Sequence, residues 1–582
     1  DPLWQQKMGT VRSGSREILQ NFAGQTSSVD PPDCNGTAGP NHYMQTINFT
    51  YNIYDKEGNH VAGPTPLNSL FSGVPGSGTN DGDPIILYDE QAGKWMVAEF
   101  SGIFGPDYMM VAVSQTDDPT GLWDRWSWPM TGFPDYMKFG VWRDGYYMGT
   151  NTPGGSEIYA FERDVMLAGG ANPKMVQFSN PWRPNSGFHC VLPVDNDGEY
   201  APAGTPGMFM TINDNAWGYA DELWVYELDV DWTNTNNSTF NRVQQISVDA
   251  FDSNLGSTWN NNIPQPGTGQ MLDGIPQILM HRVVYRKFDT TQNIVCNHTV
   301  DVDGFDHAGI RWYELQHNGT DWEIRQSGTY APDNDNRWMG SISINEDREI
   351  ALGYSVSSYT TYPSIRFTGQ TADENAQASG LMDVAETSIQ EGTSSQTSSN
   401  RWGDYSNMSV DPVDGHSFWF TTEYAISSFS KGTRIVSFTL PTAPDVDFMA
   451  SDTLPSTSDT VYFTDLSTGN PFFWSWSFAT PNVTFMEGTS AGSQHPVVRF
   501  DSQASYTVEL TATNSVGPST LVKTDYVQVG DIFKITAGAS PAEICTGDTT
   551  YLSATPSGGS GTYTYYWYSD PPGFSDTTEN PM

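Results

Sequence analysis

The chain has 582 residues, of which 68 are Asp or Glu and 26 are Lys or Arg, so its formal charge at pH 7 is −42. Such a charge repels nucleic-acid phosphates and anionic lipid, and we expect neither as a partner. Aromatic residues make up 13% of the chain, and its 55 Gly and 37 Pro punctuate many short strand-like segments. This composition predicts an all-β protein of two to four domains.

No segment approaches the roughly 20 apolar residues of a membrane span, and no signal peptide precedes Asp1. We therefore expect a processed extracellular or cell-surface protein. The four cysteines are too widely spaced for a zinc knuckle or a redox pair. We interpret them as small buried residues, with a disulfide between Cys34 and Cys190 as an alternative.

A unit recurs along the chain from about Asp33 to about Tyr424. Each copy has a head containing Gly or Asp, an apolar strand, a tight polar turn and a second apolar or aromatic strand. The heads recur at intervals of roughly 50 to 85 residues, which leaves room for four strands in each unit. In chain order they are PPDCNG, NDGDPI, FPDYMK, SGFHCV, LDGIPQ, RWMGSI and RWGDYS.

Seven heads predict a seven-bladed β-propeller over residues 1–440, because a small sheet buries its faces only by stacking against neighbours. Aromatic residues of the second strands would fill the interfaces between blades. These are Trp95, Tyr146, Tyr147, Phe418 and Trp419.

Near Pro441 an extended linker introduces a different pattern. The segments VYFTDLSTG, WSWSF and YTVELTATNSVG follow one another in the order of a PKD domain, which we place at 441–530. A second PKD or immunoglobulin-like module starts at 531 and stops about two strands short at 582, so we expect the natural protein to continue. Both modules would be small β-sandwiches that act as spacers or weak binders.

The motifs NDGDPIILYD, DYMKFGVWRDGYYM, DHAGIRWYE and RWGDYSNMSVDPVDG resemble a widespread, mostly uncharacterised family of secreted bacterial β-propeller proteins. With the C-terminal modules, the chain is similar to Bacteroidetes proteins exported by the type IX system. That resemblance implies a partner in the secretion machinery, reached through a sorting domain that this sequence lacks. It implies no inherited active site.

In a propeller the first strand of each blade lines the central channel, so the heads should meet at one axial funnel. The predicted ligand-binding residues of this funnel are Asp33, Asp83, Asp135, His189, Asp273, Arg337, Trp338, Arg401 and Asp404. Two of the carboxylates could act as acid and base on a sugar. Alternatively, each head Asp accepts backbone N–H bonds and only fixes the turn before its strand.

One loop, DVDGFD, places three carboxylates around a glycine and is a weak candidate for Ca²⁺. Its residues are Asp301, Asp303 and Asp306. The loop lacks the distal Glu of an EF-hand, and solvated turn aspartates are the alternative. Signatures of serine hydrolases, phosphate-binding loops and dinucleotide sites are missing.

Three functions remain open at this point. The first is a secreted or cell-surface binding protein whose propeller head engages a glycan or a cell-surface protein. The second is an extracellular polysaccharide hydrolase or lyase with its site in the axial funnel. The third is a structural component of an external assembly, or a secretion-system cargo. No catalytic residue is assigned.

Overall fold

The computed structural model describes residues 1–11, 18–103, 105–152, 155–179, 189–256, 260–469, 471–479, 483–514, 516–530, 533–558 and 562–582. The chain divides into two compact units, Asp1–Leu440 and Pro441–Met582. Helical elements are short: α1 (Arg163–Leu167), α2 (Ala372–Gln377), η1 (Leu67–Phe71), η2 (Asn215–Trp217) and η3 (Thr235–Asn237). Within the described ranges, no helix has the length and apolar character to cross a bilayer.

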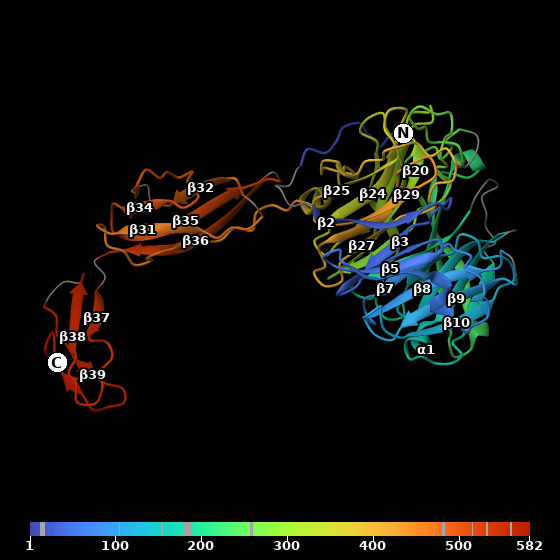
Figure 1. The fold of residues 1–582 in the computed structure, drawn as a ribbon. Coiled ribbons are helices and arrows are strands. Elements are labelled where there is room, and N and C mark those ends of the chain that lie inside the picture. Colours follow the sequence, from blue (N-terminus) through green and yellow to red (C-terminus); the bar gives the residue numbers. More distant parts are fainter. Residues whose placement is uncertain are drawn as a thin grey trace. The chain divides into compact units, whose positions relative to one another are not determined.

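The first unit is a succession of four-stranded antiparallel groups, most of them built from consecutive strands (Figure 1). The first sheet contains β3 (Asn35–Ala38), β4 (His42–Ile47), β5 (Thr50–Asp55) and β6 (His60–Pro66). The second contains β7 (Ile85–Asp89), β8 (Lys94–Ser101), β9 (Tyr108–Ser114) and β10 (Trp123–Pro129). The third contains β11 (Lys138–Val141), β12 (Gly145–Thr152), β13 (Gly155–Glu162) and β14 (Met175–Ser179).

Two further groups of four share one larger sheet. One group is β15 (Leu192–Asp197), β16 (Gly207–Asn213), β17 (Glu222–Asp229) and β18 (Thr239–Ser247). The other is β19 (Val283–Phe288), β20 (Thr291–Asp301), β21 (Ala308–His317) and β22 (Trp322–Tyr330). They join because β15 pairs with β19 in parallel, and β1 (Trp4–Gln5) adds a parallel edge to β22. Residues 186–188 of the fourth predicted head lie outside the described residues.

The next sheet contains β23 (Asn336–Ile344), β24 (Ile350–Ser357), β25 (Ser364–Gln370) and β26 (Thr387–Gln390). The one after it contains β27 (Asn407–Val410), β28 (Phe418–Ala425) and β29 (Lys431–Phe438). Its outer strand is β2 (Ile18–Ser27), which pairs with β29. An N-terminal strand therefore completes the last sheet and ties the two ends of the unit together.

The first strands of successive groups contact one another in order. Contacts join β3 to β7, β7 to β11, β11 to β15, β15 to β19, β19 to β23 and β23 to β27, and a last contact joins β27 to β3. The contacts close on themselves, which an open sandwich or a linear solenoid cannot do. The predicted all-β propeller fold is therefore confirmed.

Burial within the sheets follows from this stacking. In β8 every residue after Lys94 is buried, because neighbouring sheets cover both faces of an inner strand. In the outer strand β18, buried or half-buried residues alternate with exposed ones.

Aromatic side chains pack between sheets. The five predicted interface residues, Trp95, Tyr146, Tyr147, Phe418 and Trp419, are all buried. Tyr43 of the first sheet stacks on Trp419 of the last, with ring centroids 5.2 Å apart, so aromatic packing also joins the two sheets where the ring closes. All four cysteines are free thiols, so the disulfide alternative between Cys34 and Cys190 was wrong. Cys34, Cys190 and Cys296 are buried as predicted, whereas the prediction was wrong for Cys545, which is exposed.

The second unit begins with two antiparallel sheets around one core. One sheet contains β30 (Phe448–Ala450), β31 (Thr460–Asp465), β34 (Val497–Phe500) and β33 (Val483–Phe485). The other contains β32 (Phe473–Phe478), β35 (Ala504–Thr513) and β36 (Pro518–Val529). Buried residues of both sheets, among them Phe463 and Trp476, form a single hydrophobic cluster. Two small hairpins follow, β37 (Lys534–Ser540) with β38 (Tyr551–Ser557) and β39 (Trp567–Tyr568) with β40 (Ser575–Asp576).

Candidate functional site

The strongest candidate site is a pocket at one edge of the ring of first strands. In an antiparallel four-stranded sheet, the start of the first strand and the turn between the second and third strands lie at the same edge. Residues from these places in four sheets, with Ile275, line a cavity of about 650 Å³. The lining includes the aspartates Asp30, Asp33, Asp81, Asp83, Asp135 and Asp404, with one cation, Arg401. The predicted heads at Asp33, Asp83, Asp135, Arg401 and Asp404 therefore share this axial pocket.

Asp33 is fixed on the wall of the axial pocket by two hydrogen bonds. The side-chain amide of Asn48 donates to its Oδ2 at 2.8 Å, and the backbone N–H of Asp404 donates to its Oδ1 at 2.9 Å. The Oδ1 of Asn48 accepts the N–H of Asp83 at 2.8 Å. Asn48 thus links the first and second sheets and fixes the positions of Asp33 and Asp83 relative to each other.

Arg401 is shared between two carboxylates. Its Nε donates to Asp273 Oδ2 at 2.7 Å, and its terminal nitrogen donates to Asp404 Oδ1 at 2.5 Å. Asp273 also accepts the backbone N–H of Trp402 at 2.7 Å. Asp273 therefore lies behind the pocket wall and orients Arg401 rather than facing the cavity.

Asp83 and Asp135 are the carboxylates with the fewest protein partners. Asn151 donates to Asp135 Oδ2 at 3.2 Å. Among the described residues, no side chain or backbone group donates a hydrogen bond to the Asp83 carboxylate. Both aspartates are half-buried, so their free oxygen atoms can accept hydrogen bonds from a ligand.

Lys138 lies buried next to the pocket aspartates. Its ammonium nitrogen sits 3.4 Å from the ring centroid of Tyr136 and 4.0 Å from that of Tyr405, which is a double cation–π contact. The two phenol groups donate to backbone carbonyls, Tyr136 to Asp404 O at 3.1 Å and Tyr405 to Pro84 O at 3.0 Å. Lys138 adds positive charge near the carboxylates without forming a direct ion pair among the described residues.

Burial and mutual repulsion perturb the carboxyl groups. Burial, and then the charge of Asp404, raise the pKa of Asp33 to about 7. Burial also raises the pKa of Asp83 well above its usual value, with the charge of Asp33 adding to the effect. The pKa of Asp135 is raised by the same two causes, burial first and Asp404 second. Burial lowers the pKa of Lys138, although the nearby aspartates oppose this. The pocket therefore holds protons near neutral pH.

The backbone at the pocket wall is strained in a repeated way. Asp33, Asp83 and Tyr136 have φ values of 48°, 51° and 53°, and each lies two residues before a first strand. A side chain in this left-handed region costs about 1 to 3 kcal/mol, and such strain clusters at functional sites. Two of these three residues, Asp33 and Asp83, line the pocket.

Besides Asp273, three predicted residues lie outside this pocket. Arg337 is fully buried and binds Glu386 (Nε to Oε2, 2.8 Å) and Asp333 (2.9 Å), away from the cavity lining. Trp338 is fully buried with its ring centroid 5.8 Å from that of Trp402. His189 is buried just before β15 and does not line the cavity.

The predicted calcium loop is a self-bonded turn. Asp301 accepts hydrogen bonds from the backbone N–H groups of Asp303, Gly304, Asp306 and His307, at 3.0 to 3.3 Å. Across the described part of the chain, no group of three or more His, Cys, Asp or Glu side chains is arranged to hold a metal ion. Asp303 and Asp306 instead line a second, smaller cavity.

Several pocket residues were not predicted from the sequence. Lys138 falls within the predicted head FPDYMK, but a lysine there is expected to face solvent. Asn48 comes from the turn between β4 and β5, and Asn151 lies near the end of β12, where no motif repeats. Only their position in the topology could have indicated them, because both lie at the same sheet edge as the heads.

No protein-family model matches the chain, and no curated protein matches it. Among solved structures, the chain is similar to a PL25 ulvan lyase, with 12% identity over 74% of this chain and 96% of that one, at a TM-score of 0.37. It is also similar to the extracellular domains of Drosophila Semaphorin 1b (8% identity, 73% and 88% covered, TM-score 0.33). A third is the Penicillium chrysogenum α-L-arabinanase (9% identity, 73% and 98% covered, TM-score 0.33). At these identities and TM-scores, the likenesses assign no site, ligand or activity.

Proposed function

We propose that the first unit is a seven-bladed propeller head, secreted or displayed on the cell surface, followed by PKD-type modules at 441–530 and from 531 onward. The closed order of contacts from β3 round to β27 supports the blade number. The two sheets around the Trp476 core support the first module. The charge of −42 suits an exposed, soluble surface.

The function that the geometry supports best is recognition of a neutral glycan in the axial pocket. The observation that carries this proposal is that three of the pocket carboxylates, Asp33, Asp83 and Asp135, have no cationic partner among the described residues. A buried or half-buried carboxylate is costly unless it is paired, so an unpaired group with free acceptor oxygens is suited to a ligand. Sugar hydroxyl groups donate hydrogen bonds to such oxygens.

The charge of the pocket selects among glycans. Six aspartates line it against one arginine, and that arginine is already shared between Asp273 and Asp404. Once these carboxyl groups ionise, above their raised pKa values, they would repel uronate and sulfate groups. A lyase acting on uronates needs a group that neutralises the substrate carboxylate, and Arg401 is already committed elsewhere. The pocket thus favours neutral sugars over acidic ones and disfavours the lyase alternative.

Binding of the full chain to neutral, acidic and amino polysaccharides tests this proposal. We expect binding to neutral glycans, with an affinity at least tenfold lower in Asp83→Asn because an acceptor oxygen becomes a donor. Asp164→Asn is the matched control, since the Asp164 side chain is 85% exposed at the opposite edge. Binding only to acidic polysaccharides, or equal affinity in Asp83→Asn, would contradict the proposal.

A hydrolase is the second candidate, and the perturbed carboxyl groups favour it. A pKa of about 7 at Asp33 and a raised pKa at Asp83 provide carboxyl groups that carry a proton near neutral pH. Such a group can protonate a glycosidic oxygen while an ionised neighbour activates water or attacks the sugar. Release of reducing ends from a bound neutral glycan, lost in both Asp33→Asn and Asp83→Asn, would identify a hydrolase. Binding without release identifies a recognition head.

A further inference from the structure

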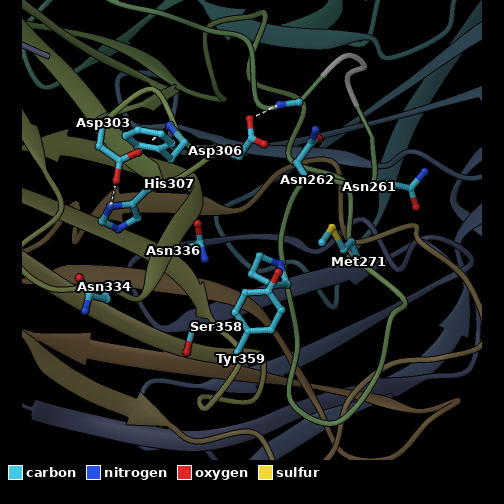
Figure 2. A pocket seen from close by; sticks show the side chains of 13 residues that line it. Asn261, Asn262, Met271, Asp303, Asp306, His307, Asn334, Asn336, Ser358 and Tyr359 are labelled. Atoms are coloured by element: carbon cyan, nitrogen blue, oxygen red, sulfur yellow. Dashed lines mark hydrogen bonds and ion pairs between the residues drawn. The ribbon is translucent and has the colours of Figure 1, made fainter.

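A second cavity, of about 310 Å³, lies over the β19–β22 group and the β23–β26 sheet of the head (Figure 2). We call it the rim cavity. Its lining comes from the turn between β20 and β21, the turn between β24 and β25, and the segments before β19 and β23. These are the same kinds of positions that line the axial pocket. The two cavities therefore open at the same edge of the ring.

Two aromatic rings at this rim cavity are unusually exposed. Phe305 is 86% exposed and Tyr359 is 68% exposed, although both line the cavity. They come from different sheets, Phe305 from the turn after β20 and Tyr359 from the turn after β24. Large exposed apolar groups mark binding surfaces, and flat aromatic rings suit the apolar faces of sugar rings.

The polar wall of the rim cavity is held in place by its own hydrogen bonds. Asn262 accepts the backbone N–H of Gly274 at 3.1 Å, and Asn336 accepts that of Ala308 at 2.9 Å. Asp306 accepts the N–H of Gly256 at 2.5 Å. Figure 2 shows this contact and the pairing of Asp303 with His307, at 3.7 Å. The wall is thus preorganised.

One amide of the wall is left for a ligand. The Asn334 side chain is exposed and makes no hydrogen bond with any described residue. An amide offers both a donor and an acceptor, which matches the paired hydroxyl groups of a sugar. Polar groups of this kind beside aromatic rings are typical of small-molecule sites.

The segment from Asn261 to Ile275 connects the two cavities. Met271 lines the rim cavity, and Ile275 lines the axial pocket. Between them, Leu272 forms an antiparallel bridge with Ile263, and Asp273 binds Arg401 of the axial pocket. The wall of one cavity continues directly into the wall of the other.

We propose that the rim cavity and the axial pocket are two subsites for one extended neutral polysaccharide chain, which crosses the segment between Met271 and Ile275. This inference rests on the proposed function of the axial pocket. Phe305 and Tyr359 stack on sugar rings at the rim, while the axial carboxylates bind the hydroxyl groups of another part of the same chain. Affinity therefore rises with the length of the ligand.

The test measures affinity of the full chain for neutral oligosaccharides of increasing length, such as cello-, manno-, xylo- and arabino-oligosaccharides of two to six sugars. We expect Phe305→Ala and Tyr359→Ala to remove the gain in affinity with length, about tenfold for the longest ligand, and to leave binding of the shortest unchanged. Both rings are exposed, so the variants should fold. Phe429→Ala is the matched control, because Phe429 is 66% exposed and lines neither cavity.

The outcomes separate this inference from the proposed function. If the gain with length survives both rim variants while Asp83→Asn still weakens every ligand, the rim subsite is refuted and the axial site stands. If the rim variants abolish all binding and Asp83→Asn has no effect, the axial site is refuted and the joint site with it. Absence of any binding by the unmodified chain overturns both.

Discussion

The two edges of the propeller ring use the same residue types in opposite ways. At the edge opposite the axial pocket, charged residues clamp neighbouring sheets. Arg163, the first residue of α1 directly after β13, binds Asp89 at the end of β7 with two hydrogen bonds of 2.6 and 2.7 Å. Lys56, just after β5, binds Asp411, just after β27, in the same way at 2.6 Å.

The axial edge shows the reverse arrangement. Asp33 and Asp83 are not paired with a cation among the described residues, and their pKa values are raised. An aspartate that clamps two sheets contributes stability, whereas an unpaired one costs stability. We infer from this difference that Asp33 and Asp83 are kept for a ligand, whereas Asp89 and Asp411 serve assembly of the ring.

The largest effect is expected from breaking the clamp at Arg163. Arg163→Ala leaves Asp89 buried without its cation, and the free energy of unfolding should fall by about 3 to 5 kcal/mol. Chemical denaturation measures this. Asp89→Asn in the Arg163→Ala background should restore part of the loss, since it removes the unpaired charge. A loss below about 1 kcal/mol would show that the pair does not clamp the sheets.

The second-largest effect is expected in how the free energy of unfolding changes with pH, because of Asp33 at the axial edge. Because the pKa of Asp33 is about 7 in the folded protein and 3.8 ordinarily, the folded state binds more protons between these values. The contribution of Asp33 to stability is therefore lost as pH rises from about 4 to 7, on the order of 4 kcal/mol. Asp33→Asn should have a shallower decline over this range. Parallel curves for the two proteins would contradict a raised pKa at Asp33.

A smaller effect is expected at the second clamp. Lys56 is partly exposed, so Lys56→Ala should lower the free energy of unfolding by only about 1 kcal/mol. Lys56→Arg keeps the charge and serves as its control. An effect as large as that of Arg163→Ala would mean that the solvent exposure of an ion pair does not determine how strongly it stabilises the fold.

The smallest effect is expected at a solvent-exposed pair. Lys287 lies 2.5 Å from Glu199, whose side chain is 72% exposed. Lys287→Ala should change the free energy of unfolding by less than about 0.5 kcal/mol, and 0.5 M salt should remove the difference. A larger change would show that surface charges also hold the ring.

The sequence predicted the axial edge better than the clamps. Asp33 and Asp83 could be predicted because both precede a first strand by the same offset, and ring closure then brings them together. Arg337 was expected at the same place, but it lies inside β23 and binds Glu386, a partner that no local pattern reveals. Long-range pairing between β2 and β29 was equally hidden.

The sequence also did not predict the residues that turns contribute to the two cavities. Asn48 and Tyr359 belong to turns between second and third strands, where sequence varies from sheet to sheet. Nothing in the local pattern distinguishes a turn that lines a cavity from one that faces solvent. Lys138 was hidden for a different reason, since its burial depends on two tyrosines from separate sheets.

The most direct test compares stability and ligand affinity in one variant, Asp83→Asn. The Asp83 carboxylate has no hydrogen-bond donor among the described residues and is repelled by Asp33. We therefore predict that at pH 8 the variant is at least as stable as the unmodified chain and binds neutral glycans at least tenfold more weakly. A variant that is less stable but binds equally well would mean that Asp83 serves the fold, and the division between the two edges would be wrong.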